Sequence, residues 1–115
     1  MAEVLLLPFP PSVNNLFAQI GRRRVMSKRG RIYRSAVVAI CGPRKPLTGE
    51  VHVKIDVYPP DRRRRDIDNL SKAVLDGLKA GGVYEDDSQV GHLDILRCAV
   101  SKPGRVVVQV EEYEP

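Results

Sequence analysis

The sequence of 115 residues contains little cysteine and no long hydrophobic run. Its two cysteines, Cys41 and Cys98, lie far apart, with no second cysteine or nearby histidine to complete the spacing of a zinc site. We therefore expect two reduced, buried thiols. The apolar stretch 4–7 ends at a proline and follows no basic leader, so we expect neither a signal peptide nor a membrane span, and hence a cytoplasmic location.

Several nucleotide and metal motifs are also missing. The chain has no Walker loop and no glycine-rich dinucleotide turn, and the segment that begins Asp66-Ile67-Asp68 lacks the glycine that a calcium loop needs at its sixth position. His52 and His92 have no ligand partners at a usable spacing, so we predict a structural role for each.

Basic residues, by contrast, are abundant and clustered. Nineteen Lys and Arg face 14 Asp and Glu, which gives a net charge of +5. Residues 22–34 hold seven basic residues and no acid, and Arg62 to Arg65 are consecutive. Such clusters suit phosphate backbones, because each neutralised phosphate releases counterions. The alternative for residues 22–31 is an ordinary solvated basic loop, since a charge run alone is weak evidence.

The hydrophobic patterns predict one domain over residues 1–115, because 43% hydrophobic residues are enough to form a core at this length. In chain order they indicate a strand, a helix, a strand, a helix and two strands, at residues 3–7, 31–41, 51–58, 67–78, 93–100 and 105–111. This order predicts an α+β (mixed α/β) fold, with two helices packed on a mixed sheet.

Two details of this fold are specific enough to be tested. The first helix is expected to use Ile32, Ala36, Ala39 and Ile40 as its apolar positions and to stop at Gly42-Pro43. The last two strands are expected to form an antiparallel hairpin. Their connection, Lys102-Pro103-Gly104, suits a type II turn with proline second and glycine third.

The second helix carries an apolar stripe on one face and charges on the other. Its stripe is Ile67, Leu70, Val74 and Leu78, and Gly81-Gly82 end it. The opposite face carries Asp68, Lys72, Asp76 and Lys79. Lys72 either stabilises charge at a scissile phosphate or forms an ordinary helix-surface pair with Asp68. Asp76 either faces solvent or pairs with one of the two lysines.

Carboxylates stand directly beside the arginine run. In an extended strand-to-helix junction, Asp66 and Asp68 can point to the same side. Their carboxylate oxygens are the ligands that hard divalent cations prefer, so the two residues can bind one ion. The alternative is that they cap the helix and interact with its dipole. Asp86 and Asp87 follow the helix and are either further ligands or ordinary loop residues. Because carboxylates repel DNA unless a cation reverses their charge, their position among arginines favours a metal-dependent phosphodiesterase.

The segment from Asp61 through Lys72, continuing to Asp86-Asp87, resembles the central motif of RusA-type Holliday-junction resolvases in order and spacing. The likeness extends to residues 7–15, to a basic loop before Tyr33-Arg34 and to the closing strands. It implies a homodimeric, Mg²⁺-dependent endonuclease, with Mn²⁺ as a possible substitute, that resolves four-way DNA junctions in recombination and repair by paired symmetric nicks.

The resemblance also implies roles for individual residues. Asp66, Asp68 and Asp87 match the family's metal-binding carboxylates and Lys72 its catalytic lysine, whereas Asp86 becomes an outer residue of the site. We expect metal-activated water to attack the phosphorus. The residues expected to bind DNA are Arg22, Arg23, Arg24, Lys28, Arg29, Arg62, Arg63, Arg64, Arg65 and Asn69. The rival interpretations are a nuclease for flaps or other branched DNA, a non-catalytic DNA-binding accessory protein and a phosphohydrolase of small nucleotides.

Overall fold

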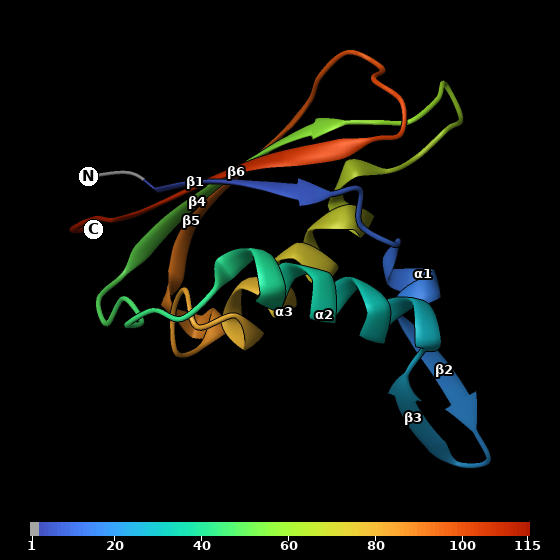
Figure 1. Cartoon of the computed structure of the whole chain (residues 1–115), viewed down its shortest axis with the longest axis horizontal. Helices are drawn as coiled ribbons and strands as arrows, with labels where there is room; N and C mark the ends of the chain where they lie inside the picture. The colour runs from blue at the N-terminus through green and yellow to red at the C-terminus, as the bar shows by residue number, and fades with distance from the viewer. Residues whose placement is uncertain (1–2) are drawn as a thin grey trace.

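A four-stranded mixed sheet lies against two helices in the computed structural model, which describes residues 3–115 (Figure 1). The strands are β1 (Glu3–Pro8), β4 (Val51–Tyr58), β5 (Val90–Arg97) and β6 (Arg105–Glu112), in the spatial order β1-β6-β4-β5. The helices are α2 (Lys28–Cys41) and α3 (Ser71–Ala80). The predicted α+β class and the predicted order of these six elements are confirmed.

The centre of the sheet is β4, and its sequence alternation separates a buried face from a more open one. Val51, Val53, Ile55 and Val57 are buried, while the residues between them are only partly covered. Val106, Val108 and Val110 of the neighbouring β6 continue the core. The helices cover this face, as expected for a strand with a period of two.

Helix α2 begins three residues earlier than predicted, at a cap formed by Ser27, whose hydroxyl accepts the Gly30 amide at 3.0 Å. Its predicted apolar face is wrong, because Ile32 is 61% exposed. The buried stripe is Gly30, Tyr33, Val37 and Cys41. Tyr33 can be buried because its hydroxyl donates to the Pro8 carbonyl at 2.9 Å.

Helix α3 packs closely on α2 because Gly77 has no side chain. A Cβ at this position would lie 3.0 Å from Val37 Cγ1, closer than most carbon contacts allow. Residues Leu70, Val74 and Leu78 are buried as the apolar stripe predicts, whereas Ile67 is only half-buried. The predicted single helix is in fact a 3₁₀ turn, η1 (Ile67–Leu70), followed by α3, which ends at Gly81.

The predicted hairpin between the last two strands is wrong. Strand β5 pairs in parallel with β4, while β6 lies antiparallel between β1 and β4. The strand–helix–strand unit β4–α3–β5 crosses over the sheet and therefore returns in the parallel direction. An alternation of apolar residues shows that a segment is a strand, but it does not identify the partner.

Two smaller expectations also need correction, one about the β5–β6 connection and one about the burial of the cysteines. The Gly104 amide donates to the Ser101 carbonyl at 2.7 Å, so the turn begins at Ser101 and Pro103, whose peptide bond is cis, occupies the third position. Cys41 and Cys98 are both free thiols, but only Cys41 is buried. Cys98 is half-buried because it follows the exposed edge strand β5.

Sequence periodicity missed four short elements. Val13–Leu16 forms the helix α1, and β2 (Phe17–Ile20) pairs with β3 (Arg23–Met26) in a small hairpin that extends from one end of the molecule (Figure 1). A second 3₁₀ turn, η2 (Asp87–Gln89), precedes β5. Within residues 3–115, no helix is long and apolar enough to cross a membrane.

Candidate active site

The arginine run forms the connection between β4 and η1, and Asp61 holds it in place. The Asp61 carboxylate accepts the Arg63 amide at 2.9 Å and pairs with the Arg65 guanidinium at 2.8 Å. The hydrogen bond from Arg65 lowers the pKa of Asp61. Arg65 also lies over the Phe9 ring, and its carbonyl accepts a 2.6 Å hydrogen bond from Arg97. Arg65 is therefore an anchor of the segment, while Arg62, Arg63 and Arg64 point into solvent.

Asp66 and Asp68 follow this anchor as exposed carboxylates. Neither side chain makes a hydrogen bond or an ion pair within the described chain, residues 3–115. Asp66 occupies the cap position of η1 but its carboxylate accepts no capping hydrogen bond. The helix-cap alternative for Asp66 therefore has no support in the geometry, and both carboxylates are available for a ligand.

Asp87 differs from these two acids because it is partly buried. Its Oδ1 atom is inaccessible and accepts no hydrogen bond from residues 3–115. Burial raises the pKa of Asp87, and the adjacent Asp76, whose negative charge disfavours ionisation of Asp87, raises it further, against the opposing effect of Lys72 and Lys79. A buried carboxylate oxygen without a donor is costly, and a cation or a proton would relieve that cost.

The neighbouring Asp86 has a different set of contacts. One carboxylate oxygen accepts the Ser88 amide at 3.0 Å, and the other pairs with Lys79 at 3.1 Å. The hydrogen bonds from Ser88 and then Lys79 bring the pKa of Asp86 well below its usual range. Because both oxygens are engaged, Asp86 shapes η2, while Asp87 keeps an oxygen without a donor.

Gln89 attaches this turn to the rest of the chain, a role that we did not predict. Its side-chain oxygen, Oε1, accepts hydrogen bonds from the backbone amides of Glu85 and Asp86, at 2.8 and 2.9 Å. Its side-chain amide donates to the carbonyls of Leu47 and Gly49, at 2.9 and 3.0 Å. Gln89 thus fixes the backbone on both sides of Asp87 through contacts with residues about 40 positions away.

Lys72 pairs with Asp76 at 3.1 Å, one helical turn further along α3. The expected alternative, an ion pair with Asp68, does not occur, whereas the suggested pairing of Asp76 with Lys72 does. Asp76 thereby connects Lys72 to Asp87. This role for Asp76 was missed, because the sequence places Asp76 on the helix surface but cannot show that η2 packs beside it.

The three candidate metal ligands are not gathered into one closed cluster. Among residues 3–115, the one group of three His, Cys, Asp or Glu ligand atoms within 4.8 Å of one another is His52, His92 and Asp94. Asp66 and Asp68 lie on the η1 side and Asp87 on the η2 side of α3. Like charges at close range repel, so such carboxylates converge only when a cation lies between them.

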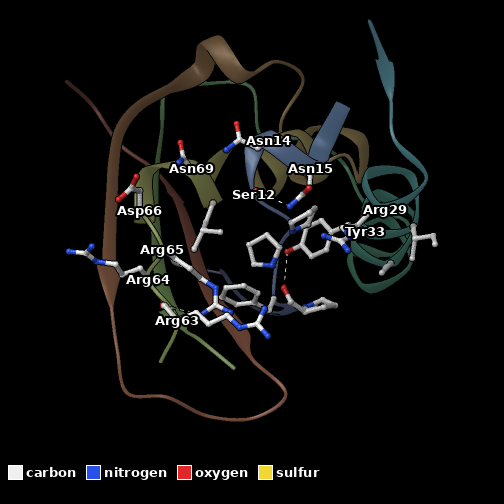
Figure 2. Close-up of a pocket in the computed structure, with 17 residues that line it drawn as sticks. Ser12, Asn14, Asn15, Arg29, Tyr33, Arg63, Arg64, Arg65, Asp66 and Asn69 are labelled. Carbon is white, nitrogen blue, oxygen red and sulfur yellow. Dashed lines mark hydrogen bonds between the residues drawn. The ribbon is translucent and has the colours of Figure 1, made fainter. Parts of the chain in front are cut away.

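A pocket of about 760 Å³ opens beside Asp66, between the proline-rich segment after β1, the start of α2 and the arginine run (Figure 2). Its floor includes Phe9 and Tyr33, and its polar rim carries Arg29, Arg63, Arg64, Asn14, Asn15 and Asn69. Amides and cations at the rim suit a phosphate group, whereas the two rings are covered, Tyr33 by burial and Phe9 by the Arg65 guanidinium.

Comparison with known proteins identifies the family. The family model described as "Endodeoxyribonuclease RusA" matches residues 8–111. The chain belongs to the RusA endodeoxyribonuclease family. It is 36% identical over 111 residues to the RusA relative of Escherichia coli K12 named "Crossover junction endodeoxyribonuclease RusA", covering 94% of this chain and 92% of the relative. A relative of the same name from Enterobacteria phage HK97 is 33% identical over 112 residues, covering 95% and 93%.

The coupling between Asp76 and Asp87 in this RusA-family site gives a testable prediction. We expect Asp76→Asn to lower the pKa of Asp87 in metal-free protein, because the substitution removes the adjacent negative charge. As the pH falls, Asp87 of the variant would then take up its proton at a lower pH than in the wild type. A carboxyl ¹³C NMR titration measures this, with Glu112→Gln at the exposed end of β6 as control. An unchanged Asp87 pKa in Asp76→Asn would contradict the coupling.

Proposed function

We propose that this RusA-family enzyme is a divalent-metal-dependent endonuclease that resolves four-way (Holliday) DNA junctions in recombination and repair. Relatives named as crossover junction endodeoxyribonucleases align with nearly its whole length, which supports this substrate. The observation that carries the chemistry is the buried Asp87 oxygen without a donor, beside Lys72 and Asp76. We further propose that residues 1–115 act as one endonuclease domain in the cytoplasm.

The donor set fits Mg²⁺, with Mn²⁺ as a possible substitute. Asp66, Asp68 and Asp87 offer oxygen ligands of the kind that hard divalent cations prefer, and the unpaired state of these groups leaves them available. When bound, such an ion neutralises charge on phosphate oxygens and makes water a stronger nucleophile. These three residues would hold the ion, and Gln89 would keep the turn that carries Asp87 in position.

Lys72 is proposed to act on the phosphate itself. Its ammonium pairs with Asp76 at 3.1 Å, and the side chain remains 48% exposed. Lys72 can therefore contact a phosphate oxygen of DNA while it stays paired with Asp76. Phosphodiester cleavage develops negative charge on the nonbridging oxygens, which an ammonium at hydrogen-bond distance stabilises. Asp76 orients this lysine through their ion pair.

The proposed DNA-binding surface consists of two basic groups. Arg22, Arg23 and Arg24 lie on the β2–β3 hairpin, followed by Lys28 and Arg29 at the start of α2. Arg62, Arg63 and Arg64 form the second group, near Asn69 and the anchoring Arg65. Arg24 stacks on the Phe17 ring, with its guanidinium carbon 4.1 Å from the ring centre, which stiffens the hairpin. Backbone charge and junction shape would dominate recognition.

Removing arginines from the hairpin gives a prediction about binding. We expect the double variant Arg22→Gln, Arg23→Gln to weaken junction binding and to reduce the slope of log affinity against log salt by roughly 0.9 per lost phosphate contact. Fluorescence anisotropy over a range of salt concentrations measures both. The matched control, Lys45→Gln with Lys102→Gln, removes the same charge outside both basic groups. Equal slopes in the two double variants would argue against a DNA-binding hairpin.

A homodimer is also part of the proposal, because two symmetric nicks require two sites and a two-fold arrangement suits a four-way junction. The face of the sheet that α2 and α3 leave uncovered supports self-association. Leu6 of β1 is 64% exposed and Leu96 of β5 is 55% exposed on this face, at opposite edges of the sheet, and a second chain that covered the face would bury both. Sedimentation velocity of the purified protein determines the oligomeric state.

A panel of end-labelled DNAs tests the function. Four-way, flap and linear substrates are incubated with the enzyme in Mg²⁺ or in EDTA. We expect Mg²⁺-dependent nicking of the four-way junction at a much higher rate than of linear duplex. Preferential cutting of flaps would mean that flaps, and not four-way junctions, are the substrate. Tight binding of the junction with no cutting of any DNA would mean that the protein binds DNA without cleaving it.

A further inference from the structure

His52, His92 and Asp94 form a cluster on the sheet face opposite α2 and α3. His52 lies on β4, and the other two residues lie on the neighbouring strand β5. Their ligand atoms all lie within 4.8 Å of one another. Neither histidine has a ligand partner at a usable spacing in the sequence, and the parallel pairing of β4 with β5 corrects the expectation drawn from that spacing. The nuclease proposal assigns no role to this cluster.

An irregularity in the pairing of β4 and β5 brings the cluster together. Val51 pairs with Val90, but His52 pairs with His92, so Gly91 is an extra residue on β5. Without this bulge, His92 would lie opposite Val53 and point toward the helix-covered face. Glycine leaves room here for two side-chain ends, because a Cβ on residue 91 would lie 2.2 Å from the Tyr113 hydroxyl and 2.4 Å from the Glu50 carboxylate, and both would have to move.

The arrangement of the ring nitrogens resembles a ligand set. The two imidazoles are stacked, with ring centres 3.8 Å apart and planes 9° apart. Both direct Nε2 to the same carboxylate oxygen, Asp94 Oδ2, at 2.8 Å from His52 and 3.3 Å from His92. In a tetrahedral zinc site, ligand atoms about 2.0–2.2 Å from the ion lie roughly 3.4 Å from each other. The two distances to Asp94 are close to that separation.

Neighbouring groups support the ligand state of His52. Glu111 Oε1 lies 3.7 Å from Nδ1, the ring nitrogen that faces away from Asp94. In the metal-free chain Nε2 is the ring nitrogen hydrogen-bonded to Asp94, at 2.8 Å. With an ion in place of that proton, the Glu111 carboxylate would favour a proton on Nδ1, which is the usual arrangement around a metal-bound histidine.

We propose that His52, His92 and Asp94 bind a divalent transition metal ion of the zinc class, separate from the proposed Mg²⁺ carboxylates. Two imidazoles and one carboxylate form a nitrogen-rich set that suits Zn²⁺ or Co²⁺ and disfavours Mg²⁺. Water completes the coordination, because His92 and Asp94 are exposed.

Such an ion would join the edge strand β5 to β4. Strand β5 lies at the edge of the sheet and pairs with β4 alone, so few contacts hold its outer side. It begins directly after η2, the turn that carries Asp87. Metal binding at His92 would therefore stabilise the start of the strand to which the Asp87 turn is attached.

Titration of untagged, full-length protein with Co²⁺, in excess Mg²⁺, tests the proposal. We expect visible absorption bands of a nitrogen-ligated ion that saturate at one Co²⁺ per chain and disappear when Zn²⁺ displaces it. His92→Gln and Asp94→Asn should lose these bands, and Glu111→Gln should bind about tenfold more weakly or worse. Zn²⁺ should raise the Tm of the wild type but not that of His92→Gln. Circular dichroism without metal verifies that the variants fold.

The control variant is Asp68→Asn, which removes a proposed Mg²⁺ ligand and should keep the Co²⁺ bands unchanged. Wild-type protein without the bands would overturn the proposal, as would equal Co²⁺ affinity in His92→Gln. Bands lost in Asp68→Asn but kept in His92→Gln would place the ion at the nuclease carboxylates instead. None of these readouts depends on DNA cleavage, so the outcome is independent of the proposed function.

Discussion

Asp68→Asn is expected to lower four-way-junction cleavage by about 100-fold or more while leaving junction binding intact or tighter. The substitution removes one proposed metal ligand and one negative charge from a surface that is proposed to face DNA. The Asp68 side chain is exposed and makes no hydrogen bond or ion pair with other residues of 3–115, so the fold should be unaffected. Single-turnover cleavage of a labelled junction and a binding titration in Ca²⁺ separate the two effects.

Glu85→Gln is the matched control for this experiment. Glu85 is an exposed carboxylate just before Asp86, and its side chain has no part in the proposed site. The Glu85→Gln variant should cleave the junction at the wild-type rate, although its change of charge is the same as that of Asp68→Asn. Cleavage at the wild-type rate in Asp68→Asn would show that Asp68 is not a ligand of the catalytic metal ion.

Lys72→Ala is expected to reduce the rate of cleavage by about 100-fold, because the variant lacks the ammonium that is proposed to stabilise charge developing on the phosphate. Junction affinity should change little, since the basic hairpin and the arginine run remain. Single-turnover kinetics at saturating enzyme measures the chemical step apart from binding.

Lys79→Ala is a close control because the two lysines have similar surroundings. Each lies on α3, is 48% exposed and pairs with an aspartate at 3.1 Å. The partner of Lys72 is next to Asp87, whereas Lys79 pairs with Asp86, the cap of η2. We expect a small effect from Lys79→Ala. Equal losses in the two variants would mean that the charge of α3, rather than a positioned lysine, is what matters.

The sequence predicted the elements of the fold better than their pairing. Alternation in β4 and the apolar stripe of α3 each follow from burial of one face, so local periodicity identifies them. The predicted pairing of β5 with β6 was wrong, because several strands present a similar apolar face and alternation does not distinguish between them. The hairpin β2–β3 was missed because Arg22, Arg23 and Arg24 interrupt any alternation, and its strands have little buried surface.

The site was predictable where its residues are close in sequence. The segment from Asp61 to Lys72 groups carboxylates with arginines in one short stretch, which favours a metal-dependent phosphodiesterase, and the family resemblance then predicts the roles of single residues. The contacts of Asp76 with Asp87, and of Gln89 with Leu47 and Gly49, depend on how η2 packs after α3. Likewise, the His52–His92 pair depends on a bulge at Gly91, for which the sequence gives no separate signal.

Mapping the nicks in a four-way junction tests the central proposal most directly. Each of the four strands is labelled in turn, and the products formed in Mg²⁺, Mn²⁺ or EDTA are resolved at single-nucleotide precision and treated with ligase. The proposed function predicts paired nicks at symmetric positions in two opposing strands, dependent on the divalent ion, and duplex products that ligase seals. Cleavage that persists in EDTA, or nicks without two-fold symmetry, would contradict it.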